Sequence, residues 1–227
     1  MEQMKRFAIY YAPEPGAFAD AAASWLGWDV QAGCAVAQPK LALPRPLADA
    51  TAEPRKYGFH GTIKPPFRLA AGVMPQDLQQ AVAQLAKSLR PVVLPGLQLV
   101  NLEGCLAFVP MGDTAELEAL AAEVVRVLDP YRAPLTAAET ARRRPERLTV
   151  RQRELLAIYG YPYVMEEFRF HLTLSGPLGA DHAAFSAAAD RHFAGVIPQP
   201  FSLAELCLFG EESDGRFHLL QRYALTA

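Results

Sequence analysis

The chain has 227 residues, of which 51% are hydrophobic and 20% are charged, and its formal net charge is −2. This is the composition of an ordinary globular protein that can bury a sizeable core. Proteins that grip long nucleic acid usually carry a clear basic excess, because phosphate contacts dominate that affinity. The charge balance therefore favours a small substrate and counts against long nucleic acid.

The sequence indicates neither a disulfide framework nor a targeting segment. Cys34, Cys105 and Cys207 are scattered and lack C-x-x-C spacing, so we expect small buried apolar residues rather than disulfides or a zinc cage. Residues 1–13 contain no apolar run long enough for a signal peptide, and no stretch approaches the ~20 apolar residues of a membrane span. We therefore expect a cytoplasmic protein without a membrane partner.

The first half of the chain predicts strands and helices in alternation. In chain order the elements are a strand at 6–12, a short helix at 18–26, a proline-containing loop at 29–50, a strand at 57–63, an amphipathic helix at 74–89 and two strand-like runs within 92–109 around a Glu103–Gly104 turn. We expect Pro65 and Pro66 to end the strand at 57–63, because proline has no N–H to donate to a strand ladder.

The second half repeats this order. The elements are a helix at 114–128 capped by Thr114, a pair of short helices within 134–159, a strand at 168–174, a helix at 181–193 and two strands at 201–209 and 217–225 joined by a polar turn. Each half has a strand that carries a histidine, then a helix, then a pair of strands. We therefore predict one α+β domain over 1–227, with duplicated halves at roughly 1–112 and 113–227 and a helical insert near 134–159.

Two tetrapeptides share the pattern His-x-Thr-apolar, namely His60-Gly61-Thr62-Ile63 and His171-Leu172-Thr173-Leu174. Alternate side chains of a strand share a face, so the His and Thr of each motif point the same way. Two such matches among five histidines arise by chance with a probability of roughly three in a thousand, which makes the pair a specific motif.

These residue types suit phosphoryl transfer. The unperturbed pKa of histidine lies near neutrality, so one imidazole can take a proton from water or a ribose hydroxyl while the other gives a proton to the leaving oxygen. Threonine hydroxyls can donate hydrogen bonds to the non-bridging phosphate oxygens. We therefore predict His60 and His171 as catalytic residues and Thr62 and Thr173 as substrate-binding residues. No metal and no cofactor is required, and the roles of acid and base stay open.

Three further residues are candidates for substrate binding. Alternation places Lys64 on the face of His60 and Arg169 on the face of His171, and Tyr57 lies just upstream of the first motif. A cation on this face could neutralise charge on a phosphate, whereas the alternative is a solvated charge at the end of a strand.

The predicted insert contains a cluster of arginines. Its members are Arg142, Arg143, Arg144, Arg147, Arg151 and Arg153. They could hold a second phosphate of the substrate, but the favoured interpretation is an exposed helical face paired with Glu139, Glu146 and Glu154.

The paired motifs resemble the 2H phosphoesterase superfamily, which includes bacterial 2',3'-cyclic phosphodiesterase/RNA ligase-like proteins and plant cyclic phosphodiesterases. The stretches RFAIYYAPEPG, SWLGWD, TAEPRKYGFHGTIKPPFRL and FRFHLTLSGPL are similar to a branch associated with bacterial phosphonate metabolism. The resemblance implies a bilobal fold in which two antiparallel sheets meet at a cleft lined by His60, Thr62, His171 and Thr173, with helices outside. It also implies a small cyclic phosphate as substrate, with a ribose cyclic phosphate as the candidate. Gly61 stands where relatives often carry Ala, which we expect to be a minor departure.

Three alternatives remain. An RNA-end enzyme acting on 2',3'-cyclic termini or 2'-5' linkages would use the same chemistry, but its groove must accommodate RNA. A non-catalytic module could bind a nucleotide or phosphate with the same four residues. A metallohydrolase is disfavoured because no carboxylate set lies near either motif. The sequence leaves the oligomeric state open.

Overall fold

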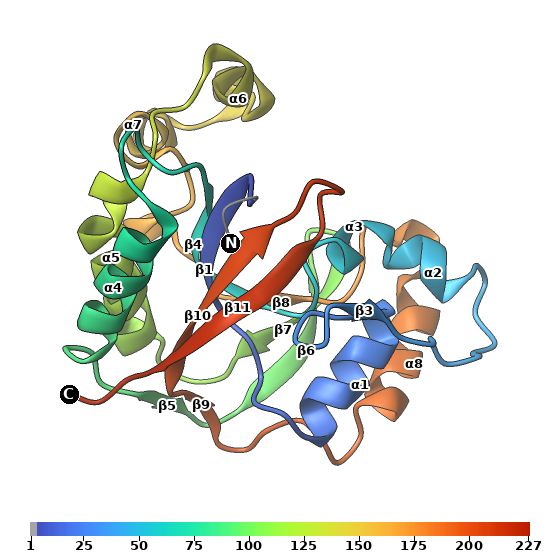
Figure 1. The fold of residues 1–227 in the computed structure, drawn as a ribbon. Helices are drawn as coiled ribbons and strands as arrows, with labels where there is room; N and C mark the ends of the chain where they lie inside the picture. The colour runs from blue at the N-terminus through green and yellow to red at the C-terminus, as the bar shows by residue number, and fades with distance from the viewer. Residues whose placement is uncertain (1–3) are drawn as a thin grey trace.

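The computed structural model describes residues 4–227 and has an α+β architecture with a large antiparallel sheet at its centre (Figure 1). The strands of this sheet are β1 (Arg6–Tyr11), β4 (Gly61–Phe67), β6 (Leu97–Leu102), β7 (Cys105–Pro110), β8 (Leu172–Thr173), β10 (Glu205–Glu211) and β11 (Phe217–Ala224). Their order is β11-β10-β1-β4-β8-β7-β6. Two small sheets pair β2 (Trp28–Asp29) with β3 (Cys34–Ala35) and β5 (Val92–Leu94) with β9 (Phe201–Leu203).

The longer helices lie outside this sheet, as Figure 1 shows. They are α1 (Ala17–Leu26), α4 (Pro75–Ala86), α5 (Ala115–Val127) and α8 (His182–His192). Their apolar stripes pack with Phe7, Ile9 and Tyr11 of β1 into the main core. The alternate residues of β1 point to the opposite face, where Tyr10 packs with Phe209 and others in a smaller apolar cluster.

The other α-helices are the short α2 (Leu47–Ala50), α3 (Ala52–Arg55) and α6 (Ala137–Arg142), and α7 (Val150–Tyr159), which is as long as α1. The last two form the predicted helical insert, which Figure 1 shows beyond α5 at the top of the view. Threonines cap both helices, because Thr136 and Thr149 accept hydrogen bonds from the backbone N–H groups of Glu139 and Gln152.

The α+β class and the antiparallel strands are confirmed, but the strands expected in two sheets form one continuous sheet. A single residue pair, Gly61 opposite Leu172, joins β4 to β8 at its centre. The hairpin β10–β11 follows β8 in the chain yet extends the sheet beyond β1, while β6–β7 follows β4 yet extends it beyond β8. Each side of the sheet thus combines strands from both predicted halves.

Most predicted elements lie within a few residues of those observed, and the Glu103–Gly104 turn is confirmed by positive φ angles of 51° and 89°. The expected stop at Pro65 and Pro66 is wrong, since β4 continues to Phe67. Among residues 4–227 no strand pairs with β4 on its β8 side beyond Gly61, and the register of β4 with β1 is irregular, so the missing proline N–H groups break no regular ladder.

Several local expectations differ from the structure. The strand predicted at 168–174 is reduced to Leu172–Thr173. The expected loop at 29–50 contains β3 and α2. Thr114 does not cap α5 with its side chain; Asp113 accepts the N–H of Ala115 instead.

All three cysteines are free, but the expected burial is confirmed for Cys207 alone among them, since Cys34 is exposed and Cys105 is half-buried. Within residues 4–227 no helix is long and apolar enough to cross a membrane.

Candidate active site

The pairing of β4 with β8 brings the two motifs side by side. Since Gly61 lies opposite Leu172 in an antiparallel pair, Thr62 lies across from His171 and Thr173 across from His60. All four side chains therefore share one face, while Leu172 points into the main core. Thr62 pairs with Tyr10 of β1, which places the motifs on the face that carries the smaller apolar cluster.

The two imidazoles are oriented in the same way. His60 Nδ1 lies 2.9 Å from the carbonyl oxygen of Gly58, and His171 Nδ1 lies 2.9 Å from that of Arg169. A carbonyl oxygen can only accept, so each Nδ1 carries the proton and donates it. Each Nε2 is thereby left free to accept a proton from, or donate one to, a bound molecule.

His60 is packed between aromatic rings. Its ring stacks on Tyr10 at a centroid distance of 4.0 Å, and Tyr57 lies 5.8 Å away. Burial is the main cause that lowers the pKa of His60 to about 4; the Gly58 carbonyl opposes this effect, and the nearby charge of His171 adds to it. His60 is therefore neutral at pH 7, the state in which Nε2 accepts a proton.

We expect the His60 ring to titrate near pH 4 rather than near the ordinary value of 6.5. Because the folded state binds this proton less readily than the unfolded chain, the free energy of unfolding should fall as the pH drops from 6.5 towards 4. An NMR titration of the imidazole resonances measures the pKa directly, with His60→Ala identifying the resonance. A His60 midpoint at or above 6.5 would contradict the neutral state of this half-buried ring.

The threonine hydroxyls complete the face. Thr62 and Thr173 are both half-buried, and within residues 4–227 neither side chain has a hydrogen-bond partner. Both hydroxyl protons are therefore available to an anion bound between the histidines.

Lys64 does not share this face, which corrects the prediction. Its partner in β1 is Ile9, a main-core residue, because the register shifts between Ile9 and Tyr10. A bulge of this kind resets the alternation on which the prediction depended. The ammonium group instead contacts Val125 O at 3.3 Å and Asp129 Oδ1 at 3.4 Å.

The two other candidate binding residues have different surroundings. Tyr57 lies beside His60 and stacks on Phe217 at 5.1 Å. The exposed Arg169 guanidinium donates to the carbonyl oxygens of Glu166 and Phe168, while its own carbonyl holds His171. A role of the Arg169 side chain in binding stays a prediction.

Sequence reasoning missed Tyr10 as a neighbour of the site. Its place depends on which strand pairs with β4 and in what register, and these long-range pairings leave no local pattern in the sequence. Gly61 was also underestimated, since a Cβ added there would lie 2.3 Å from Cζ of Phe170.

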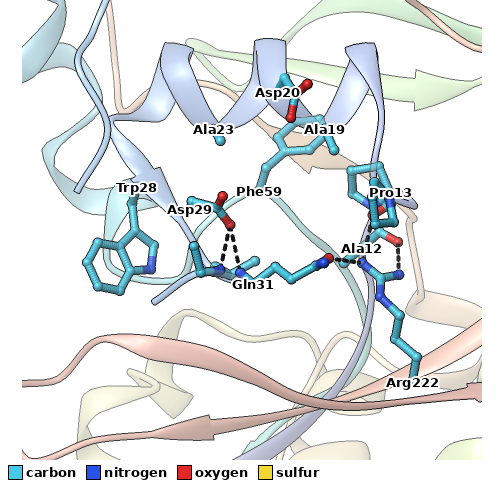
Figure 2. A pocket seen from close by; sticks show the side chains of 13 residues that line it. Ala12, Pro13, Ala19, Asp20, Ala23, Trp28, Asp29, Gln31, Phe59 and Arg222 are labelled. Carbon is cyan, nitrogen blue, oxygen red and sulfur yellow. Dashed lines mark hydrogen bonds between the residues drawn. The ribbon is translucent and has the colours of Figure 1, made fainter. Parts of the chain in front are cut away.

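Two cavities help to locate the site. One, of about 300 Å³, lies beside α1 and β2 and includes none of the predicted residues (Figure 2). Two of its polar side chains are already hydrogen-bonded, because Arg222 donates to the carbonyls of Ala12 and Pro13, and Asp29 accepts the N–H groups of the next turn. The other, of about 240 Å³, is lined by Tyr57, the residue whose ring also lies beside His60.

Two of the three remaining histidines contact structural groups, whereas the buried Nε2 of His182 has no hydrogen-bond partner within residues 4–227. His192 contacts Ala21 O at 2.8 Å, and His218 packs edge-on against Trp28. In the described part of the chain no group of three or more His, Cys, Asp or Glu side chains is arranged to hold a metal ion.

Comparison with known proteins identifies the family to which the chain belongs. Residues 62–218 match the family model described as "Protein of unknown function (DUF1045)". A curated relative from a Janthinobacterium species is 36% identical over 94% of this chain, and one from Laribacter hongkongensis is 33% identical over 92%. Both are named "Ribose 1,5-bisphosphate phosphokinase PhnN", and this chain spans only 49% of the length of each.

Solved structures resemble the chain more distantly. A "Crystal structure of phosphoesterase" is 16% identical with a TM-score of 0.44, covering 99% of this chain and 100% of that one. The E. coli LigT structure complexed with 3'-AMP is 16% identical with a TM-score of 0.43, covering 98% of both chains.

Proposed function

We propose that this chain, which belongs to the DUF1045 family, is a phosphoesterase of the 2H type. It opens a small cyclic phosphate by general acid–base catalysis without a metal. The observation that carries this proposal is the pairing of Gly61 with Leu172, which sets two His–Thr pairs across from each other on one face. Both Nε2 atoms and both hydroxyls are free to meet a substrate.

The surroundings of His60 suggest how the roles divide. Its lowered pKa makes His60 the base, so its Nε2 takes a proton from the attacking water. The water oxygen bonds to phosphorus, the ring P–O bond breaks, and Nε2 of protonated His171 gives a proton to the released oxygen. The hydroxyls of Thr62 and Thr173 donate to the non-bridging oxygens, where negative charge concentrates.

The substrate that we favour is a ribose 1,2-cyclic phosphate that carries a second phosphate on O5. Cleavage of its bond between phosphorus and O2 yields ribose 1,5-bisphosphate, the compound in the name of both curated relatives. This chain contains no G-x-x-x-x-G-K-[ST] sequence, the usual phosphate loop of ATP-dependent enzymes, and it matches only about half of those relatives. Ring opening by this chain would supply ribose 1,5-bisphosphate, the compound that the name of the curated relatives contains.

The test is turnover of a substrate panel by the pure protein in excess EDTA. We expect the ribose 1,2-cyclic phosphate that carries a phosphate on O5 to be opened to ribose 1,5-bisphosphate, which phosphorus NMR detects. Preference for nucleoside 2',3'-cyclic phosphates would favour an RNA-end enzyme. No turnover by the folded protein would favour a binding module, and loss of turnover in EDTA would contradict metal independence.

A further inference from the structure

The cavity lined by Tyr57 is strongly basic. It lies between the free edge of β4 and the insert formed by α6 and α7, and Tyr57 is the residue that it shares with the surroundings of His60. Its cationic lining residues, called the basic pocket below, are Arg6, Lys64, Arg68, Arg132, Arg142 and Arg143. The single carboxylate in the lining is that of Glu139.

Four of these cations are held by carboxylates. Arg6 is paired with Glu211, and Arg68 with Glu139 at 2.9 Å. Lys64 and Arg132 share one carboxylate, that of Asp129, at 3.4 and 2.8 Å. The basic pocket therefore keeps an excess of positive charge even when the neighbouring carboxylates are included.

The remaining two cations have no carboxylate partner within residues 4–227. The guanidinium of Arg143 lies over the ring of Tyr161 at 4.8 Å, which fixes its position without neutralising its charge. Arg142 ends α6 and is exposed. The expected pairing of the arginine cluster with Glu139 is not observed, because Glu139 binds Arg68; only Arg151 pairs within its own helix, with Glu154.

The size of the pocket limits what it can hold. Its volume of about 240 Å³ is below the ~300–1,000 Å³ of pockets that enclose whole drug-sized ligands. It suits one compact anionic group, and arginine guanidinium groups match the oxygens of a phosphate.

Resting on the proposed phosphoesterase function, we propose that the basic pocket binds the second phosphate of a doubly phosphorylated substrate, with Arg142 and Arg143 as its free cations. The ring phosphate then lies between His60 and His171 while the distant phosphate lies beyond Tyr57. The helical insert thereby selects a substrate with two phosphates over a cyclic phosphate that lacks the second phosphate. Binding would also favour the charged form of Lys64, whose pKa burial lowers to about 8.

The test compares two substrates that differ only in the second phosphate, the ribose 1,2-cyclic phosphates with and without a phosphate on O5. For Arg142→Gln and Arg143→Gln we expect the ratio of kcat/KM between them to fall about 10- to 100-fold, the value of one charge-assisted hydrogen bond. Arg147→Gln is the matched control, an exposed arginine of the same segment outside the basic pocket. An unchanged ratio, or equal losses on both substrates, would overturn the proposal.

A binding measurement separates this inference from the proposed function. Ribose 5-phosphate, titrated calorimetrically into the His60→Ala variant, should bind as to the wild type, and Arg142→Gln should weaken that binding. Should the wild type bind ribose 5-phosphate through these arginines yet open no cyclic phosphate, the proposed function alone fails. If the arginine variants bind the probe as the wild type does, the basic pocket is not the phosphate site.

Discussion

Replacing either histidine is expected to remove most of the turnover of a cyclic phosphate. Each of His60→Ala and His171→Ala should lower kcat by about 10²- to 10⁴-fold, the usual contribution of one positioned proton transfer. The two residues act on one displacement, so the double variant should lose much less than the product of the single losses. Steady-state kinetics in EDTA measure both effects.

The controls for this prediction come from the same chain. His182→Gln changes a histidine outside the site and should keep wild-type turnover, and thermal unfolding shows whether each variant is folded. The acidic limb of the pH profile of kcat/KM, expected near pH 4 in the wild type, should be absent from the residual activity of His60→Ala. Near-wild-type turnover by either alanine variant would exclude the two-histidine mechanism.

The fold class followed from local patterns, because these are determined by residues near each other in the chain. Leu78, Val82 and Leu85 recur at helical spacing and are buried on one face of α4. The alternation of β1 likewise matches its two buried faces, with Ile9 in the main core and Tyr10 in the smaller cluster.

The long-range pairings could not be read in this way. Nothing local to residues 201–225 indicates that β10 pairs with β1 at the other end of the chain. The irregular register between β1 and β4 is likewise not indicated by any local pattern. Because of it, the Lys64 side chain does not lie on the face that simple alternation predicts.

The candidate site was predictable only in part. Period-two alternation is enough to put His60 and Thr62 on one face, and likewise His171 and Thr173. That the two faces meet depends on the Gly61–Leu172 pair, which only the structure reveals. The expected exposure of the arginine cluster is confirmed for all members but the half-buried Arg143. That Arg142 and Arg143 also line a cavity depends on where the insert packs, which the sequence did not indicate.

Gly61→Ala is expected to destabilise the protein and to disturb the site together. A methyl group there would lie 2.3 Å from Cζ and 2.4 Å from Cε2 of Phe170, well inside van der Waals contact. The ring has little room to retreat, since it is buried against Tyr11 and Phe201. We expect the free energy of unfolding to fall by about 1–3 kcal/mol, the usual cost of overpacking a core. We also expect kcat to fall, because the overlap lies at the pair that aligns the two motifs.

A double-mutant cycle isolates the cause of this effect. Phe170→Leu shortens the side chain that the new methyl group meets, so adding Gly61→Ala to Phe170→Leu should cost less than adding it to the wild type. Gly176→Ala is the matched control, because a Cβ there meets only the Ala50 carbonyl oxygen at 3.7 Å, an ordinary contact. Chemical denaturation gives the four stabilities. If Gly61→Ala unfolds at the same denaturant concentration as the wild type, the β4–β8 pair does not need a glycine. Relatives that carry Ala at this position are accordingly expected to have a smaller side chain, or a displaced ring, where this chain has Phe170.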